Sequence, residues 1–391
     1  MKRLAATVAK RIAHGARIPP ALSRYRIVPT IDPLEYAADM ATGSIQELFP
    51  AHKGGAGLPV NVRSRSDLPE DRGRWRRSFH DVVTRDRRAV SLLSMADCRI
   101  LAVRSDWDQE HFAVLSPTNR RLTLSGTRWL PEHRQLLTER RTEAATTCAN
   151  FVWESWYGNY FHWTVRHLPK LWLSKARKID ESIVRPPAFE PKPVWVDSLR
   201  WLDLSFDQMP RMESEILRVE RLTFVHTLDL NPYMLRAYRD AIVPSASTVR
   251  RKIFISRANA NYRRLENEAD VERLVAAYGY EIVRLEELTF AAQLRLFSEA
   301  KVVLSLHGAG LANIIYSPTS THVVEIIDPS FPNPEYFDLA TAMGHFYWMV
   351  KGSPVGEPRP GYHDIRVDVS DLEQTLTQVS DKAGETSEIG T

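Results

Sequence analysis

The sequence predicts an α/β protein of two domains, the second of which has a parallel, doubly wound sheet. At 391 residues the chain is longer than one hydrophobic core usually supports. Its second half alternates short apolar runs with amphipathic segments of helix length, and such crossovers produce parallel strands. A turn with glycines at 308 and 310 directly follows one of these apolar runs. In sheets of this kind, ligands bind beyond the carboxyl ends of the strands.

Residues 1–98 are predicted as a basic N-terminal extension followed by an irregular region. The first 30 residues contain seven Lys or Arg and no acid, with Leu4, Val8 and Ile12 at helical spacing. Two interpretations are open, a surface helix attracted to anionic lipid or a frayed basic leader. Residues 31–95 are rich in Arg, Pro and Gly with alternating charge signs, which predicts a solvated irregular segment.

Residues 99–245 are predicted as an N-terminal α/β domain. Strand-like runs alternate here with an aromatic-rich block, "FVWESWYGNYFHWTVRHLPKLWLSKA". The predicted elements, in order, are strand-like runs at 99–105, 111–116, 192–198 and 216–226 and a helix near 231–243.

Residues 246–370 are predicted as the second domain, and its pattern is clearer. The predicted order is strand 251–257, helix 267–280, strand 280–285, helix 289–300, strand 301–308, helix 310–317 and strand 322–328. Asn267 is the predicted N-cap of the first helix, and Gly279 is its stop signal. Residues 371–391 are acidic and rich in Ser and Thr, which predicts a polar tail.

Composition is that of an ordinary globular protein, with 43% hydrophobic and 26% charged residues and a formal net charge of +4. Cys98 and Cys148 have no neighbour at metal-ligand spacing, so we expect neither a disulfide framework nor a zinc knuckle. No apolar window reaches the ~18 residues of a membrane span, and no secretory signal is visible. We therefore expect a cytoplasmic protein. Trp75 lies in the arginine-rich region without an aromatic ladder, so no nucleic-acid partner is expected.

Polar residues follow three predicted strands of the second domain and are expected at one edge of its sheet. Arg257 ends the first strand, His307 to Gly310 follow the third, and Glu325 lies near the end of the fourth. Because the carboxyl ends of parallel strands meet at one edge, these side chains should converge.

The loop after the first strand contains Arg257, Arg263 and Arg264. A guanidinium binds a diphosphate through a planar fork, and each contact at ~4 Å and effective dielectric ~20 is worth roughly 4 kcal/mol before desolvation. Two such residues could replace a divalent metal. The alternative is a loop of ordinary surface arginines.

The turn His307-Gly308-Ala309-Gly310 is a candidate anion cradle. Gly308 and Gly310 allow positive φ and close approach, so amides at the start of the following helix could bind an anion. The alternative is a turn needed only for packing. Asn313 replaces the third glycine of a dinucleotide fingerprint, and the chain has no G-x-S-x-G, so nicotinamide binding and ester hydrolysis are disfavoured.

Two further candidates involve buried or clustered polar residues. Glu325 lies in an apolar strand, where ribose hydroxyls or a structural partner would have to satisfy it. His162 and His167 lie five residues apart in the aromatic block, and His162 could accept a proton from an acceptor hydroxyl, since its unperturbed pKa is near 6.5. Each histidine could equally be a satisfied core residue.

Asp106 and Asp108 have the D-x-D spacing that can hold Mn²⁺ or Mg²⁺ beneath a nucleotide diphosphate. The pattern is short and frequent by chance, and the nucleotide-like features lie in the other half of the chain.

Residues 251–327 together with 159–172, "NYFHWTVRHLPKLW", resemble the family 61 glycosyltransferases, formerly the domain of unknown function 563, which include capsular polysaccharide biosynthesis proteins. The resemblance covers about residues 150–330. It depends on an ordered series, namely an S-R strand end, an R-x-x-N-E helix start, an H-G-A-G-L turn and a V-V-E strand.

The resemblance implies two Rossmann-like, doubly wound domains in a GT-B-like arrangement. It also implies sugar transfer from a nucleotide diphosphate donor such as a UDP-sugar, with inversion, no required metal and no other cofactor. Transferred to this sequence, the family's donor-binding residues are Arg257 and Arg263 for the diphosphate, Asn267 in the helix-start motif, His307, Gly308, Ala309 and Gly310 for the cradle, and Glu325 for the ribose.

One position departs from the family pattern. Many relatives carry Asp or Glu four residues after the motif histidine, where this chain has Arg166. The general base is then His162, His167 or an acid elsewhere, or the activity has been lost.

We expect an inverting, metal-independent transferase that uses a glycan or lipid-linked glycan acceptor in the cytoplasm, with peripheral membrane contact through the basic N-terminus. The rivals are an inactive nucleotide- or glycan-binding module and a metal-dependent transferase that uses Asp106 and Asp108.

Overall fold

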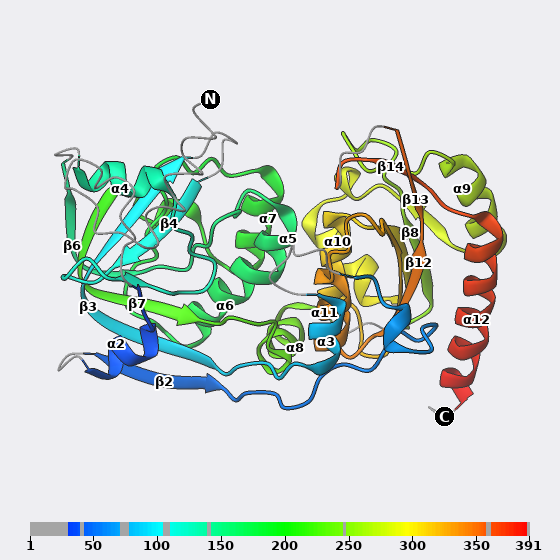
Figure 1. The fold of residues 1–391 in the computed structure, drawn as a ribbon, viewed down its shortest axis with the longest axis horizontal. Coiled ribbons are helices and arrows are strands. Elements are labelled where there is room, and N and C mark those ends of the chain that lie inside the picture. The colour runs from blue at the N-terminus through cyan, green and yellow to red at the C-terminus, as the bar shows by residue number, and fades with distance from the viewer. Residues whose placement is uncertain are drawn as a thin grey trace. The chain divides into compact units, whose positions relative to one another are not determined.

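The computed structural model describes residues 30–39, 43–70, 78–104, 110–138, 142–244, 248–356 and 361–388. They divide between two units, which Figure 1 shows as ribbons. Unit 1 comprises Met1–Phe49, Ala89–Lys192 and Asp203–Leu228, and unit 2 comprises Pro50–Arg88, Pro193–Leu202 and Asp229–Thr391. The chain thus enters unit 2 before it has completed unit 1. These boundaries differ from the predicted ones because two segments of the first half pack with the second.

Unit 1 contains a 7-stranded mixed sheet of order β1-β5-β4-β3-β7-β6, with β2 paired to β3. Its strands are β1 (Thr30–Ile31), β2 (Ser44–Phe49), β3 (Val90–Arg104), β4 (Glu110–Leu115), β5 (Arg121–Leu122), β6 (Ala144–Asn150) and β7 (Ile216–His226). The long strand β3 pairs antiparallel with β2, β4 and β7. The prediction of a Rossmann-like sheet in this half is therefore wrong. Consecutive strands β3 and β4 are joined by a short connection, which permits only antiparallel pairing.

The helices of unit 1 are short. They are α2 (Pro33–Asp39), α4 (Pro131–Thr138), α5 (Tyr160–His162), the π-helical turn η3 (Trp163–His167), α6 (Leu168–Ala176) and η4 (Phe206–Gln208). The predicted aromatic block supplies much of the core, because Phe151, Trp153 and Trp163 are fully buried beside Phe112 and Phe224.

Unit 2 contains a 5-stranded sheet of order β12-β11-β10-β8-β9, and every pair in it is parallel. The strands are β8 (Arg251–Ile255), β9 (Glu281–Val283), β10 (Ala300–Leu306), β11 (His322–Ile327) and β12 (Phe346–Lys351). In Figure 1, α9 (Glu268–Ala277) and α12 (Val369–Glu388) cover one face, while α10 (Phe290–Ser298) and α11 (Glu335–Met343) lie on the other. The doubly wound prediction for this half is confirmed.

The amphipathic patterns of unit 2 explain its helices. Val271 and Val275 of α9 are buried against the sheet, and Gly279 ends that helix at φ 76°. In α10 the aligned residues Phe290, Leu294 and Phe297 are buried, and Thr289 caps the first turn by accepting the Ala292 N–H.

Three other segments differ from the predictions. Residues 193–201 form α7 (Pro193–Trp201) rather than a strand, since Trp195 and Leu199 are buried at helical spacing. The predicted polar tail contains α12, whose Leu372, Leu376 and Val379 repeat every three or four residues and join the core of unit 2. The polar residues between them obscured this apolar stripe.

The predicted irregular region also contributes to unit 2. Residues 50–88 contain η2 (Arg65–Asp67) and α3 (Phe79–Thr84), and Phe79 and Val82 of α3 are buried. Ser78 and Asp81 form a capping box at the start of α3. The remaining elements of unit 2 are α8 (Pro232–Ile242), η5 (Leu285–Glu287), η6 (Ala309–Tyr316), β13 (Ser353–Val355) and β14 (Asp364–Arg366).

No helix among the described residues has the length and apolar character needed to cross a membrane.

Candidate anion site at the edge of the parallel sheet

The carboxyl ends of β8 and β10 bring Arg257 against the glycine turn. The two strands run parallel with Ser305 opposite Ile255, so the chain leaves both strands side by side. A Cβ atom at Gly308 would lie 1.9 Å from a terminal nitrogen of Arg257 and 2.6 Å from its Cζ. The guanidinium therefore rests directly on Gly308. The predicted meeting of the arginine loop and the turn is confirmed.

The reason for the two glycines differs from the prediction. Gly308 has φ −176°, which any residue can adopt, and Gly310 is not among the glycines with positive φ. The expectation that both use positive φ is wrong. Glycine is needed at 308 because the Arg257 guanidinium occupies the space of a side chain. At Gly310, a Cβ atom would lie 2.9 Å from Cδ1 of Leu285, so this glycine permits close packing.

Arg257 is held in place by the carbonyls of its own loop. Its Nε donates to the Arg263 carbonyl at 2.8 Å, and a terminal nitrogen donates to the Tyr262 carbonyl at 3.0 Å. Arg263 itself has φ 57°, the left-handed conformation that is uncommon for a residue with a side chain. Strained backbone of this kind is found most often at binding and catalytic sites.

The positive charge at this edge lies near the Glu268 carboxylate, which accepts the Arg257 backbone N–H at 3.2 Å. Among the described residues, neither Arg257 nor Arg263 has a carboxylate within ion-pair distance, whereas Arg264 pairs with Asp364 at 2.9 Å. Burial, and then the charge of Arg263, lower the pKa of the Arg257 guanidinium. Nε of Arg263 is buried without a hydrogen-bond partner, and its guanidinium lies over the ring of Phe331 at 5.8 Å. Two neighbouring cations of this kind favour an anionic ligand.

The start of η6 adds backbone donors to the same edge. Gly308 is the N-cap of this 3₁₀ helix, and the first bond within it runs from the Leu311 N–H to the Gly308 carbonyl at 3.0 Å. The amides of Ala309 and Gly310 precede that bond, and such N-terminal amides favour anions.

His307 is oriented by a buried carboxylate. Its Nδ1 lies 2.5 Å from Oε1 of Glu325, and the Tyr347 hydroxyl donates to Oε2 of Glu325 at 2.6 Å. Because a carboxylate only accepts, the hydrogen of the His307 ring is on Nδ1, and Nε2 remains for a ligand. Burial, with the Glu325 charge, raises the pKa of Tyr347 well above its ordinary value.

This arrangement corrects the predicted role of Glu325. The side chain is completely buried, and each of its oxygens already has a protein partner. It is not placed to bind a ribose. The sequence left a structural partner open as the alternative, and the structure shows two such partners, a histidine and a tyrosine.

Asn267 is also engaged within the protein. It occupies the predicted N-cap position of α9, but its side chain makes no capping bond. Instead its amide donates to the Val367 carbonyl at 2.9 Å and accepts the Val367 N–H at 3.2 Å. This two-way contact tethers the segment before α12, so Asn267 is a structural residue and the predicted ligand role is not supported by its geometry.

In unit 1, His167 is a satisfied core histidine. It is fully buried, its Nδ1 donates to the His162 carbonyl at 2.8 Å, and its Nε2 accepts the Glu154 N–H at 2.9 Å. Burial lowers its pKa to about 4 despite the charge of Glu154. Both ring nitrogens bond to backbone groups, and this geometry favours the alternative of a satisfied core histidine over the predicted catalytic role.

His162 has a different environment. It ends α5, directly before the π-helical turn, and its Nδ1 is buried without a hydrogen-bond partner. Burial, and then the charge of Arg166, lower its pKa to about 3. The ring is thus neutral at physiological pH, and it is a weak base.

The sequence analysis missed a buried ion pair beside these histidines. Nζ of Lys170 lies 2.5 Å from Oε1 of Glu154, and the two side chains are 0% and 2% exposed. Burial raises the pKa of Glu154, but the charges of Lys170 and Arg166 outweigh it and the net shift is downward. A Cβ at Gly126 would lie 2.2 Å from the Glu154 side chain, so a glycine with φ 66° makes room for this carboxylate. A charged residue within the apolar run "FVWES" was the available signal.

Two predictions lie outside the described residues, namely the Asp106 and Asp108 pair and the basic N-terminal extension up to residue 29. Within the described residues, no cluster of three or more His, Cys, Asp or Glu is arranged to hold a metal ion.

The geometry thus defines an α/β protein with a candidate anion site at the edge of a parallel sheet. Comparison with known proteins specifies the class. Residues 160–324 match the family described as Glycosyltransferase 61, so this part of the chain carries a glycosyltransferase domain of that family, as the sequence resemblance indicated. None of the curated proteins matches the chain.

Solved structures with weak similarity are also glycosyltransferases. One is the dodecameric iron-containing heptosyltransferase TibC in complex with ADP-D-beta-D-heptose, with 11% identity, a TM-score of 0.28 and coverage of 76% of this chain and 94% of that chain. Another is the iron-containing dodecameric glycosyltransferase TibC from enterotoxigenic E. coli H10407, with 10% identity and the same TM-score and coverage. Similarity at this level carries no argument about the fold or the reaction of this chain.

Proposed function

We propose that this chain is an inverting, metal-independent glycosyltransferase that moves a sugar from a nucleoside diphosphate donor, a UDP-sugar, to a glycan or polysaccharide acceptor. The observation that carries the proposal is the pair Arg257 and Arg263, which lies at the edge of the parallel sheet without a described carboxylate partner. Two guanidinium groups can neutralise a diphosphate, the task that a divalent cation performs in other transferases. Unit 2 is the proposed donor-binding unit.

The proposed reaction is a single in-line displacement. The acceptor hydroxyl oxygen forms a bond to the anomeric carbon, the bond from that carbon to the diphosphate breaks, and the hydroxyl proton passes to a base. Negative charge then develops on the leaving diphosphate. Arg257, Arg263 and the first amides of η6 would stabilise that charge, because donors fixed before the reaction need no reorganisation.

His307 is proposed as an additional contact to the donor, in which its ring accepts a hydrogen bond from a hydroxyl group of the nucleotide sugar. Glu325 fixes the ring with Nδ1–H toward the carboxylate, which leaves Nε2 for the ligand. The hydroxyl of Tyr347 holds Glu325 from the other side. This chain of three side chains gives the glutamate of the family motif a positioning role.

The acceptor is proposed to bind in unit 1 near His162, which would receive the hydroxyl proton. A pKa of about 3 makes His162 a weak base, so the orientation of the acceptor would contribute more than proton affinity. Glu154 is held by Lys170 and is not available for this role without breaking a buried ion pair.

The test is a thermal-shift screen of the purified chain against nucleotide sugars, with and without excess chelator. A bound donor at ~100 times its dissociation constant adds about 2.7 kcal/mol to stability, which is readily measured as a shift in Tm. We expect a shift with one nucleotide diphosphate sugar that persists in chelator. A response to no nucleotide would contradict the proposal. A response that disappears in chelator would favour the metal-dependent alternative with Asp106 and Asp108.

A second candidate function is a binding module without turnover, which the presence of Arg166 in place of an acid favours. Release of nucleoside diphosphate from the bound donor separates the two. Slow hydrolysis or transfer supports the enzyme, while tight binding without release supports the module.

A cytoplasmic location and peripheral membrane contact through the basic N-terminus remain part of the proposal, and fractionation of cells that express the full chain would test them.

A further inference from the structure

Residues 50–88, which we call the strap, belong to unit 2 although they precede the central strand of unit 1 in the sequence. They lie outside the residues that match the glycosyltransferase family. Two of its contacts with the rest of unit 2 lead toward the candidate anion site, one with the edge strand β12 and one with the helix α11.

The first contact is with β12, the outermost strand of the sheet. The Val60 N–H donates to the Tyr347 carbonyl at 2.8 Å. The side chain of Asn61 donates to the Met349 carbonyl at 2.8 Å and accepts the Met349 N–H at 3.0 Å. The strap thereby covers the open edge of β12 and fixes the backbone of Tyr347, the residue whose hydroxyl binds Glu325.

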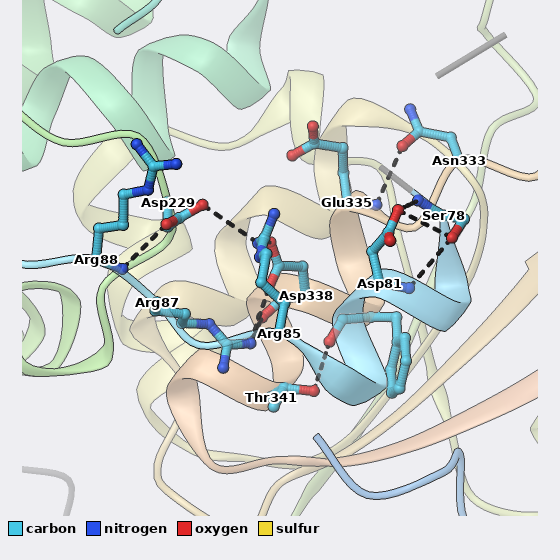
Figure 2. Close-up of polar contacts among 11 residues, drawn as sticks. Ser78, Asp81, Arg85, Arg87, Arg88, Asp229, Asn333, Glu335, Asp338 and Thr341 are labelled. Carbon is cyan, nitrogen blue, oxygen red and sulfur yellow. Dashed lines mark hydrogen bonds and ion pairs between the residues drawn. The ribbon is translucent and has the colours of Figure 1, made fainter. Parts of the chain in front are cut away.

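The second contact is with α11, and Figure 2 shows its polar part. Arg87 pairs with Asp338 at 2.7 Å, and both side chains are 2% exposed. Arg85 lies 3.3 Å from Asp338 and 3.4 Å from Asp229, so the two arginines converge on one aspartate of the helix. Beside this cluster, the rings of Phe79 and Phe337 stack with centroids 5.6 Å apart.

Both contacts lead to the same pair of residues. Tyr336, two residues before Asp338 on α11, has its ring 5.0 Å from the ring of His307. Phe337 has its ring 4.9 Å from that of Tyr347. The strap thus contacts both elements that enclose the hydrogen-bonded pair His307 and Glu325, one through Tyr336 and the other through Tyr347.

A buried ion pair such as Arg87 with Asp338 is weak evidence for stability, because apolar residues of similar volume often stabilise a protein as well. What the pair does provide is direction, since one terminal nitrogen of Arg87 donates to both the carboxylate and the backbone carbonyl of Asp338. Asn61 also fixes direction, because its side-chain amide binds both the N–H and the carbonyl of Met349.

We propose that the strap positions the His307 and Glu325 pair for the bound nucleotide, with Asn61 acting through β12 and Arg87 acting through α11. The inference rests on the proposed function, because it assumes that a nucleoside diphosphate binds at this edge. It assigns a role in donor binding to a segment that the family motifs do not include.

The experiment measures the dissociation constant of uridine diphosphate by calorimetry for the full chain and its variants. Asn61→Ala removes the two bonds to Met349, and Arg87→Lys keeps the charge but removes the guanidinium nitrogen that donates to both the carboxylate and the carbonyl of Asp338. We expect both to weaken binding about five- to tenfold with a stoichiometry near one, the size associated with one lost hydrogen bond. A merely structural role would lower the active fraction, and thus the stoichiometry, and leave the dissociation constant unchanged.

A double-mutant cycle tests whether Asn61 acts on the His307 and Glu325 pair through Tyr347. Tyr347→Phe removes the bond to Glu325, and if Asn61 acts through Tyr347, the double variant should be no weaker than Tyr347→Phe alone. Arg251→Met is the matched control, since it breaks ion pairs at the amino end of β8 in the same sheet and should leave binding unchanged.

The outcomes separate the two proposals. If the unmodified chain does not bind uridine diphosphate, the proposed function fails. If it binds, and Asn61→Ala and Arg87→Lys bind with the same dissociation constant, or the cycle is additive, the positioning role of the strap fails alone.

Discussion

Two regions of this chain contain the same kinds of side chain and use them in opposite ways. In unit 1, the buried Glu154 is neutralised by Lys170, and both ring nitrogens of His167 bond to backbone. In unit 2, the buried Glu325 orients His307, while Arg257 rests on Gly308 without a carboxylate partner among the described residues. In unit 1 the buried charges are paired within the protein. In unit 2 the positive charge of Arg257 has no described ion-pair partner and is available to a ligand.

The difference shows that a cluster of histidines and charged residues indicates a binding site only when some of its charged groups are not paired within the protein. A buried pair satisfied inside the protein contributes to folding and specificity of packing. Cations held by backbone carbonyls, as Arg257 is, remain available to an anion. The comparison therefore predicts that mutations in unit 1 change stability, while mutations at the edge of unit 2 change ligand binding.

The largest expected effect is on stability, from Lys170→Met. Removing Lys170 leaves Glu154 charged and buried without its partner, which typically costs about 3–5 kcal/mol. Chemical denaturation would measure the loss. Lys175→Met is the matched control, because Lys175 pairs with Asp203 on the surface and should change stability by less than about 1 kcal/mol. Equal effects of the two substitutions would contradict the role of the buried Lys170 and Glu154 pair in stability.

The next effect is on binding, from Gly308→Ala. The added methyl group would collide with the Arg257 guanidinium, and the backbone at φ −176° accepts alanine without strain. We expect uridine diphosphate to bind about tenfold more weakly, a change of about 1.4 kcal/mol, with little loss of stability. Combined with Arg257→Ala, the substitution should add almost nothing further.

Gly384→Ala provides the control for this prediction, because a Cβ atom at that position meets nothing within 4 Å. Binding by Gly384→Ala should equal that of the unmodified chain. Normal binding by Gly308→Ala as well would show that the contact between Arg257 and the turn does not matter for the ligand.

The smallest expected effect is the pH dependence contributed by unit 1. Burial lowers the pKa of His167 to about 4 and that of His162 to about 3, below the ordinary value of 6.5 that each has when unfolded. Between these values the unfolded chain binds more protons than the folded one, so stability is complete above pH 6.5 and falls as the pH decreases toward 4.

We expect a loss on the order of 1 kcal/mol or more for His167 in that range. An NMR titration of the imidazole signals of the folded protein is the direct measurement, and it should find both rings neutral at about pH 5.5. A protonated His167 at that pH would contradict its role as a buried core residue with both ring nitrogens bonded to backbone.

Much of unit 2 could be predicted from the sequence because its signals are local. The alternation of β8, α9, β9, α10, β10 and β11 appears as changes between strand and helix periodicity, and Gly279 marks the end of a helix. The convergence of Arg257 with the turn at Gly308 followed from the parallel order alone.

The rest depended on contacts distant in sequence. The mixed sheet of unit 1 is set by which strands pair, and the short runs at 99–105 and 111–116 do not specify this. The partner of Glu325 is Tyr347, 22 residues away, and the partner of Arg87 is Asp338, 251 residues away. The role of His167 became clear only from the backbone groups around it.

The most direct test of the account is the rate of nucleoside diphosphate release from the donor, measured in excess chelator for Arg257→Ala and Arg264→Ala. Both remove one arginine of the same loop, but Arg264 is already paired with Asp364. We predict that Arg257→Ala loses roughly 100-fold or more in rate, by analogy with the loss of one transition-state donor, and that Arg264→Ala stays within about fivefold of the unmodified chain. Equal rates for the two variants, or activity that vanishes with the chelator, would contradict the claim that free arginines hold the diphosphate.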